Sequence, residues 1–416
     1  MSTINRLLCI FVRFQLLQEG IFCEKRTINI YIFTVVLFTV LLVLGNRIAT
    51  TGEAVQNVGA TTVSEELKVV NIIDDAYEET LYADYPDARS ESIVLFEGEF
   101  TKGYKKGTTT TAVQRVDALY AVEIEQVEIG DKVVAYRNPD PSIPADYMFA
   151  EYNRVPVLFV LMALFCLLIL FFGKSKGFNA IISLVLTLAS IFWVLLPAIL
   201  RHKNVYFWSI LVCIYTIFMT LLIVSGWTRK SLAAIIGCTS GVLACGVIVL
   251  ISDLFLNVTG LVDEDALYLL MLDSENPISI KAVVFAAIII GAVGAVMDVA
   301  MDIASALAEI KAQAPDISAA QIVKSGFSIG HDIIGTMTNT LILAYIGSSL
   351  SITLLMVAGN PSMLYLLNTE MIVVELLQAI AGSFGMLLTI PLTSLVCGIL
   401  YSTKSKNKTM YKNDAE

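Results

Sequence analysis

Long apolar runs separated by short polar turns dominate the chain, and this pattern predicts membrane-spanning helices. A helix that crosses a bilayer core needs about 20 mostly apolar residues, and runs of about 18 or more recur along the sequence. The predicted fold class is an all-α polytopic membrane helix bundle, with a small extracytoplasmic β-rich domain between its first and second spans. Eight spans are expected, at about residues 28–45, 155–172, 178–199, 205–225, 231–255, 281–308, 333–358 and 372–400.

Residues 46–152 break this pattern, because apolar and polar residues partly alternate there over short stretches. Stretches rich in Val, Ile and Thr and bounded by Gly, Asp or Pro are typical of strands in a small β-barrel or β-sandwich. A stiff linker at Asp140–Pro144 is expected to lead back to the membrane. The expected strand segments are Glu66–Asp74, Ser92–Thr101, Thr108–Asp117, Ala121–Glu128 and, after a Gly–Asp turn, Ile129–Tyr136.

Composition supports a membrane protein and locates its charge. Hydrophobic residues make up 56% of the 416 residues and charged residues 15%, so the chain is far more apolar than a soluble globular protein. The net charge of −10 arises from residues 46–152, which hold 20 Asp and Glu against 9 Lys and Arg. This acidity argues against nucleic acid as a partner, and it is compatible either with cation attraction or with a well-hydrated soluble domain. No cysteine lies in this segment, so no disulfide framework is expected.

Basic turns predict which ends of the spans face the cytoplasm. Turns such as those at Lys174 and Arg229, together with the basic tail, alternate with acidic loops. The positive-inside rule then places both termini in the cytoplasm and residues 46–152 outside, with the turn at His202 as the exception. The first span is expected to be an uncleaved signal anchor, because no small-residue cleavage site follows it. The predicted segments are the N-terminal segment, the anchor, the outer domain, a seven-span membrane domain and the tail, at residues 1–27, 28–45, 46–152, 153–400 and 401–416.

The span at 281–308 carries acids that are hard to explain as structure alone. Asp298 and Asp302 lie in a run that is otherwise almost wholly apolar or small, and ionisable residues inside a membrane are costly. At about 100° per residue they share a helix face with a row of small residues that favours close helix packing. That row is Ala287, Gly291 and Ala295. The alternative is that this end of the helix emerges into water, with its acids solvated.

Two later spans repeat the combination of polar and small residues on one stripe. Three such stripes predict a shared polar interior that a proton, ion or small solute could follow. For Asn339 the alternative is interhelical hydrogen bonding without transport. The residues are Asp332, Thr336 and Asn339 in the first of these spans, and Gln378, Gly382 and Gly385 in the last.

The connection between the two acidic spans, residues 311–330, carries signals for a short helix. Pro315 is expected to stop the preceding helix, and Ser318 with Gln321 fits a capping box. Gly326 can end the short helix. From its position alone, such a helix is a candidate gate at the inner mouth of the polar interior.

Motifs for catalysis and for cofactors are scarce. The sequence has two histidines, His202 and His331, and no HExxH, GxSxG or Walker A motif, so we do not expect an enzyme. No cofactor is expected. No metal site is expected either: Asp298 and Asp302 could hold a cation with Asp332, but carboxylates at helical spacing are a weak metal signal.

Two segments of the membrane part resemble the YibE/F family of bacterial membrane proteins. They are GAVGAVMDVAMDIASAL from Gly291 and SGFSIGHDIIGTMTNTLILAYIGSSL from Ser325. The resemblance extends over about residues 155–400, and the acidic domain before it looks like the extracytoplasmic part of longer family members. The chain departs from the family pattern at His331, where arginine is expected, and at Asp302, where a small or hydroxyl residue is expected.

The resemblance implies a multi-pass protein in the plasma membrane of a Gram-positive bacterium, and it implies no settled biochemical activity. A paralogous membrane subunit is an implied partner, beside a homo-oligomer and the lipid bilayer itself.

Two functions fit these observations. The first is a transporter or permease for an unidentified small solute or ion, in which Asp298 binds a proton or cation and Asp302, Asp332 and Asn339 shape the path. The second is a membrane scaffold or sensor that transports nothing and whose outer domain binds a ligand or partner. A membrane-embedded hydrolase is the weakest reading, for lack of a nucleophile and a base.

Overall fold

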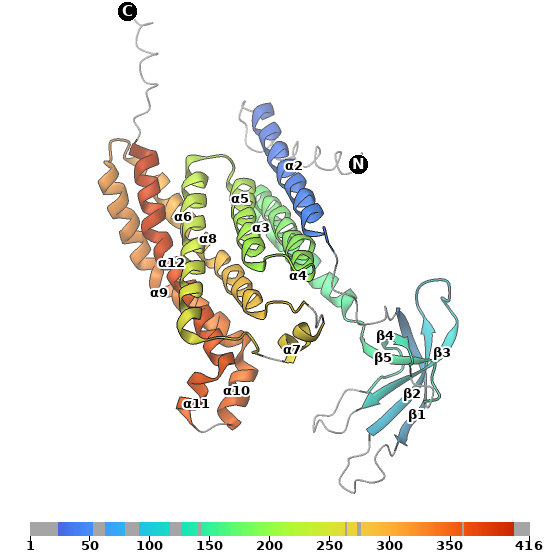
Figure 1. Cartoon of the computed structure of the whole chain (residues 1–416). Helices are drawn as coiled ribbons and strands as arrows, with labels where there is room; N and C mark the ends of the chain where they lie inside the picture. Colours follow the sequence, from blue (N-terminus) through green and yellow to red (C-terminus); the bar gives the residue numbers. More distant parts are fainter. Residues whose placement is uncertain are drawn as a thin grey trace, which may run out of the picture. The chain divides into compact units, whose positions relative to one another are not determined.

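A computed structural model describes residues 24–52, 63–79, 91–116, 126–139, 143–262, 264–272, 276–359 and 362–402. The chain divides into two compact units (Figure 1). One comprises residues 1–56 with 169–416 and is helical, and the other comprises residues 57–168 and contains all the described strands. Each unit has a hydrophobic core of its own.

The described strands close into a barrel. They are β1 (Ser64–Glu79), β2 (Glu91–Phe100), β3 (Thr109–Val116), β4 (Lys132–Arg137) and β5 (Tyr147–Tyr152). Their order is β1-β2-β3-β5-β4, and β1 pairs with both β2 and β4 while β3 runs parallel to β5. This is the arrangement of a five-stranded OB-type barrel. Of the two architectures expected from the sequence, the barrel is therefore the correct one.

Alternation along the strands fills this barrel. Successive side chains of a strand point to opposite faces, so every second apolar residue points inward. Leu67 on β1, Phe96 on β2 and Val133 on β4 are fully buried in one cluster, with Ala112 of β3 beside them.

The predicted linker at Asp140–Pro144 is wrong, because its described residues belong to the barrel. Ile143 is buried against Ile93 and Val113. The Asn138 backbone N–H donates to Asp146 O at 2.9 Å, which joins the two ends of the β4–β5 connection. Proline signals a turn, and a turn between two strands satisfies that signal as well as a linker does. Of the strand expected at Ala121–Glu128, residues 121–125 lie outside the described residues and residues 126–128 are not in a strand.

Charged side chains tie the β2–β3 turn to β1. Lys102 Nζ and Thr101 Oγ1 each donate to the Glu66 carboxylate at 2.7 Å, and these hydrogen bonds lower the pKa of Glu66 from its ordinary value of 4.5. Lys105 Nζ donates to Tyr147 Oη at 2.8 Å and to Glu65 Oε1 at 3.0 Å, and both bonds raise the pKa of Lys105.

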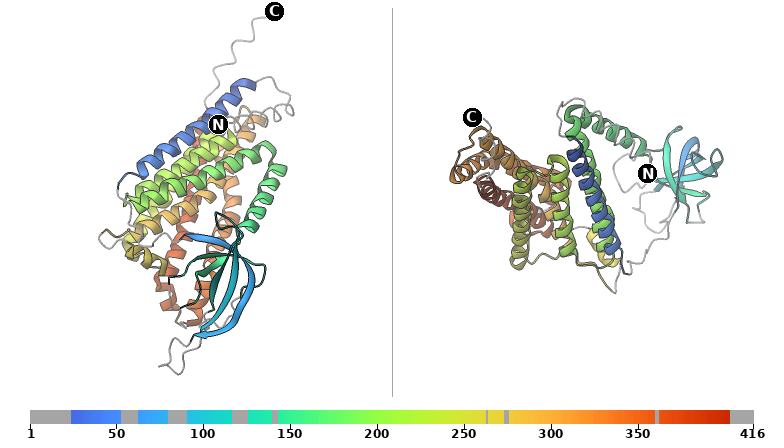
Figure 2. Two further views of the ribbon diagram at one scale, coloured as in Figure 1. Left: turned by 90° about the vertical axis from the view of Figure 1, so that its right-hand side faces the viewer. Right: turned by 90° about the horizontal axis from the view of Figure 1, so that it is seen from above.

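The helical unit is a bundle that extends from α2 on one side to α9 on the other (Figure 2). The long described helices and helical segments of the chain are α2 (Glu24–Ala49), α3 (Val155–Ser190) with η1 (Ile191–Leu195) and α4 (Leu196–Leu200), α5 (Val205–Ser225), α6 (Arg229–Leu256), α8 (Ile280–Gln313), α9 (Ala319–Ser348) and α12 (Glu370–Ser402). The short ones are α7 (Glu264–Met271), α10 (Leu350–Gly359) and α11 (Met363–Asn368). The first part of α3, residues 155–168, belongs to the other unit.

Six helices in the described part of the chain are long and apolar enough to cross a membrane, or seven if the bent pair α9–α10 forms one span. The sequence predicts eight. The difference arises because the spans expected at 155–172 and 178–199 form one helical stretch, Val155–Leu200. Lys174 within that stretch has φ 47° and ψ −122°, which is not helical, so two helices meet there across a kink.

The connection before α9 differs from its prediction. The capping box of Ser318 and Gln321 is confirmed, and α8 ends at Gln313, just before Pro315. Gly326, however, ends no helix: α9 continues through it to Ser348, and Gly326 packs against Ser394 of α12. A separate gate helix at this place is therefore wrong.

Small residues let α6 and α12 approach each other closely. A Cβ at Gly241 would collide with Thr389 Oγ1 and lie 2.9 Å from Gly385 O, and one at Gly237 would collide with Thr393. The same Cβ at Gly241 would lie 3.1 Å from Val296 on α8. In lipid the hydrophobic effect does not drive helices together, so the close packing that small residues allow supplies the attraction. Gly241 therefore lies where α6, α8 and α12 meet.

Glu370 fastens the loop after α6 to the start of α12. Its Oε1 accepts hydrogen bonds from the backbone N–H groups of Thr259 and Gly260, both at 2.5 Å, and Thr259 Oγ1 donates to Oε2 at 2.8 Å. Gly260 has φ +90°, a conformation that favours glycine, and this conformation turns its N–H toward the carboxylate.

Gly241→Ala is expected to destabilise the helical unit by about 1–3 kcal/mol, because the added methyl overpacks the contact of α6 with α12. Thermal unfolding in detergent micelles measures this effect. Ser240→Ala is the matched control, since the Ser240 hydroxyl bonds only to Ile236 O of its own helix. Equal melting temperatures for the two variants would contradict the close contact.

The Glu66 ion pair predicts a pH dependence of barrel stability. The pKa of Glu66 is lower in the folded barrel than in the unfolded chain. Its contribution is therefore complete above about pH 4.5 and is lost as the pH falls below that value. Glu66→Gln is expected to reduce the free energy of unfolding at pH 7 by about 0.5–1 kcal/mol and to flatten its slope between pH 5 and 3. Urea unfolding of residues 57–154, followed by circular dichroism, tests this, and an unchanged slope would contradict it.

Candidate functional site

The packing of α8 places Asp298 halfway through the bundle. Gly241 lies twelve residues from Arg229 and twelve from Asp253, the charged residues near the two ends of α6, or about 18 Å from each. Val296 of α8 contacts this midpoint, and Asp298 follows two residues later. A carboxylate at this depth is far from either end of the helices, which weakens the alternative that Asp298 is simply solvated at a helix mouth. Asp302 lies one turn further toward the predicted cytoplasmic side.

Both carboxylates are exposed on the surface of the single chain. Asp298 and Asp302 point away from the buried face of α8, which packs on α6 and α12 through residues such as Val296, Ala300 and Ile303. Among the described residues, none donates a hydrogen bond or forms a salt bridge to either carboxylate. Their charges must therefore be met by water, by a cation, by a proton or by another chain.

A tyrosine from α9 closes the same face of α8 two turns further out. A Cβ at Gly291 would lie 2.6 Å from Tyr345 Oη and 3.4 Å from Gln378 Nε2 of α12. Gly382 contributes to the same junction, since a Cβ there would lie 3.0 Å from Leu341 and 3.9 Å from Tyr345 Oη. The absence of side chains at Gly291 and Gly382 makes room for the phenol ring. The predicted site residues Gly291, Gln378 and Gly382 thus meet, and Tyr345, which sequence reasoning missed, joins them.

The polar stripe of α9 does not join this junction. The buried residues of α9 are Ile322, Gly326 and Gly330, and Gly330 packs against Ile390 of α12. Asp332, Thr336 and Asn339 are exposed. At about 100° per residue Asp332 and Asn339 lie on the side of the helix opposite Gly330, and Thr336 lies about 120° from it. Within one chain the three predicted stripes therefore do not enclose a shared interior.

The remaining predicted packing residues differ in their surroundings. Ala287 is exposed, and Ala295 is half-buried against the core of the helical unit. Gly385 lies in the contact of α12 with α6, where a Cβ would lie 3.1 Å from Cys245 Cβ. The small-residue row of α6, Gly237–Gly241–Cys245, carries that contact and is visible in the sequence as residues spaced four apart, although we did not single it out there.

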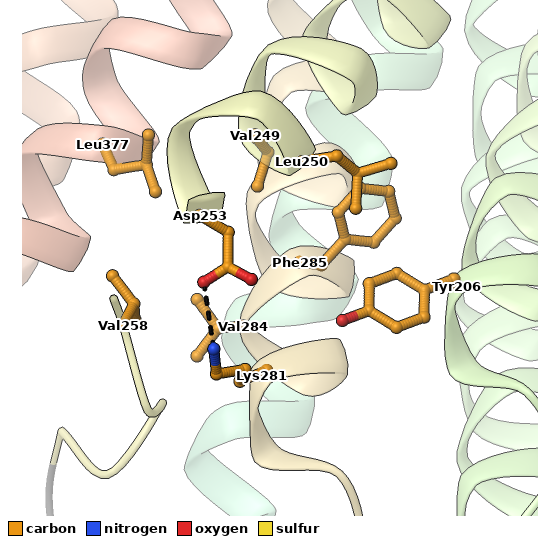
Figure 3. A pocket seen from close by; sticks show the side chains of 9 residues that line it. All are labelled: Tyr206, Val249, Leu250, Asp253, Val258, Lys281, Val284, Phe285 and Leu377. Carbon is orange, nitrogen blue, oxygen red and sulfur yellow. Dashed lines mark hydrogen bonds and ion pairs between the residues drawn. The ribbon is translucent and has the colours of Figure 1, made fainter. Parts of the chain in front are cut away.

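An ion pair that sequence reasoning also missed lies at the end of the bundle predicted to face outward (Figure 3). Lys281 of α8 and Asp253 of α6 are 3.3 Å apart. They line a small, open hollow with Tyr206 of α5 and apolar side chains of α6, α8 and α12. Asp253 and Lys281 lie near facing ends of neighbouring predicted spans, and this opposite charge is a signal that could have paired them.

The described residues hold no group of three or more His, Cys, Asp and Glu that could bind a metal ion. The five described cysteines are free, and four of them are buried in the helical unit.

These features define a multi-pass membrane protein with carboxylates exposed within its apolar helices and a β-barrel domain of its own. The family model of YibE/F-like proteins matches residues 161–403, which is more than half of the chain. The chain therefore belongs to the YibE/F family, and the resemblance of its two motif segments is confirmed. No curated protein and no solved structure matches the chain.

Gly291→Ala is expected to push the Tyr345 ring away from α8, because the added methyl would lie 2.6 Å from its hydroxyl. In an Asp298→Cys background, the displaced ring should speed the reaction of the new thiol with a water-soluble maleimide added to proteoliposomes. Gly294→Ala is the matched control, since nothing described lies within 4 Å of a Cβ at that position. Equal labelling rates for the two variants would show that Tyr345 does not restrict access to position 298.

Proposed function

We propose that the protein is a transporter in which Asp298 binds and releases a proton or a cation. The observation that carries this proposal is the position of Asp298, halfway through an apolar bundle yet on an exposed face and without a described partner. Stability alone gives no reason for a carboxylate there, because a charge at the centre of a bilayer costs at least ~2.5 kcal/mol.

The junction of Gly291, Tyr345 and Gln378 supports a pathway that is closed on one side. It covers the face of α8 on the predicted outer side of Asp298, whereas Asp302 continues the acidic face toward the predicted cytoplasmic side. A transporter needs a site that opens to one side of the membrane at a time. The single ring of Tyr345, which packs on Gly291 and Gly382, could move aside at a small energetic cost. In the proposed cycle Tyr345 swings away from Gly291 and exposes Asp298 to the outside.

We further propose eight spans with both termini in the cytoplasm and residues 46–152 outside the plasma membrane. A straight helix of 46 residues, the length of Val155–Leu200, would be about 69 Å long, more than twice the thickness of a bilayer core. The kink at Lys174 supports two crossings of the membrane in place of one. With α9 and α10 counted as one bent span, the total is eight. The acidic barrel then has the role of recruiting a solute or a cation at the entrance.

A second candidate function is a scaffold or sensor that transports nothing. The outward direction of the polar stripe on α9 supports it, because a stripe that points away from its own bundle suits contact with another chain and encloses no path. In this case the barrel binds the ligand or partner, and Asp298 contributes only to contacts between chains.

Asp298→Asn is expected to abolish proton or cation movement, because the amide has the shape of the carboxyl group but does not ionise and carries no charge. Proteoliposomes with an internal pH-sensitive dye measure the collapse of an imposed pH gradient, and we expect the rate to fall at least about 10-fold. Asp265→Asn, at an exposed position on α7, is the charge-matched control.

Two outcomes separate the candidates. If wild type and Asp298→Asn dissipate the gradient at the same rate above empty liposomes, the role of Asp298 is wrong. If neither exceeds empty liposomes while Asp298→Asn lowers the yield of an assembled complex, the scaffold function is supported instead.

A further inference from the structure

The exposed polar stripe of α9 lies at a depth where lipid would otherwise surround it. Gly330 packs on Ile390 of α12, whose neighbour Thr389 packs on Gly241, the midpoint of α6. Asp332 therefore lies close to the middle of the bundle, and Asn339 lies about 10 Å further toward the predicted outer side. A bilayer core extends about 15 Å to each side of its centre, so both side chains are at hydrocarbon depth.

Nothing in the described part of this chain covers that stripe. Asp332, Thr336 and Asn339 are exposed, and no described residue hydrogen-bonds the Asn339 amide or pairs with Asp332. Gly335 between them has no described atom within 4 Å of a Cβ. Lipid tails offer no hydrogen-bond partner, and unsatisfied polar groups in hydrocarbon are costly. Another polypeptide would supply the hydrogen-bond partners that lipid tails lack.

We propose that the partner is a second copy of this chain, which places its own α9 against the same face across a two-fold axis normal to the membrane. This face, the α9 seam, consists of His331, Asp332, Gly335 and Asn339. The chemistry of the seam is complementary to itself, and this is what points to a second copy in preference to a different protein.

The amide of Asn339 is the first self-complementary group. It carries both donors and an acceptor, so the two copies of one asparagine on a two-fold axis can satisfy each other. A single buried asparagine that pairs with its own copy fixes register in parallel helix pairs in this way. Gly335, one turn away on about the same line of the helix, lets the two backbones approach at the crossing point.

The neighbouring side chains of His331 and Asp332 are the second self-complementary group. Counted at about 100° per residue, His331 and Asp332 lie on opposite flanks of the line through Gly335 and Asn339. In a two-fold pair of parallel helices, one flank of each helix meets the other flank of its partner. Each Asp332 thus meets the partner copy's histidine at the same position, and the pair forms twice. Both side chains are exposed in the single chain, so they are free to turn toward a partner.

The α9 seam stands independently of the proposed transport. A scaffold and a transporter both need their mid-depth polar groups covered, so failure of one proposal leaves the other testable.

Disulfide formation at the seam tests the second copy directly. In the full chain with Cys9, Cys23 and Cys166 changed to serine, Asn339→Cys places two thiols at the axis, close enough to bond. Oxidation in native membranes is expected to give a dimer-sized band that contains only this chain. Leu243→Cys is the matched control, since Leu243 is also exposed near the middle of the bundle, on α6, and should stay monomeric.

A second variant guards against disulfides formed by random collision. Asn339→Leu is expected to raise the dissociation constant of the dimer in detergent about 3- to 20-fold. The melting temperature of the monomer should stay unchanged, because the Asn339 side chain forms no hydrogen bond with any described residue of its own chain. Analytical ultracentrifugation with a fluorescent label measures the dissociation constant.

Three outcomes overturn the proposal: a monomeric band for Asn339→Cys like that of Leu243→Cys, a disulfide with a different protein, or an unchanged dissociation constant for Asn339→Leu. A dimer-sized band specific to position 339, together with a weakened dimer for Asn339→Leu, supports it.

Discussion

Close approach of helix backbones at small residues is the constraint on which the helical unit depends. Gly237 and Gly241 bring α6 onto Thr393 and Thr389 of α12, and Gly326 and Gly330 bring α9 onto the other side of the same helix. In a bilayer the hydrophobic effect does not hold helices together, so close contacts of this kind supply the attraction. These contacts also fix the axial position of each helix relative to its neighbour, and therefore the depth of the other residues on it.

The depth of Asp298 and Asp332 in the bundle bears on the role that each carboxylate can have. Val296 touches the midpoint of α6, so Asp298 lies near the middle of the bundle, which weakens the alternative of a helix mouth. Asp332 reaches nearly the same level through the contact of Gly330 with Ile390. The two acids differ in direction: Asp298 shares its face with the Tyr345 junction, whereas Asp332 points away from α12. The first direction suits a path along the exposed face of α8, and the second suits a contact between chains.

The barrel follows a different physical rule from the helices. Apolar side chains such as Leu67 and Phe96 fill its centre, and charged residues such as Glu66 and Lys102 pair at its rim, as is typical of a domain that folds in water. Five strands close on one another and leave no open edge, which suits a small domain exposed to solvent. The two units therefore show, in one chain, the solutions that protein structure adopts in water and in lipid.

The sequence by itself determined the class of fold, because runs of apolar residues and alternating stretches follow directly from the solvent that each segment faces. It also identified the acids and glycines of residues 282–347 and the capping box at Ser318. Only the tertiary structure decided that Gly326 is a packing residue and ends no helix, that Tyr345 closes the face above Asp298, and that the stripe of Asn339 points outward. A helical period shows which residues share a face of one helix. Which neighbour that face meets depends on contacts between distant segments, such as those of α12 with α6 and α9, and no local pattern encodes them.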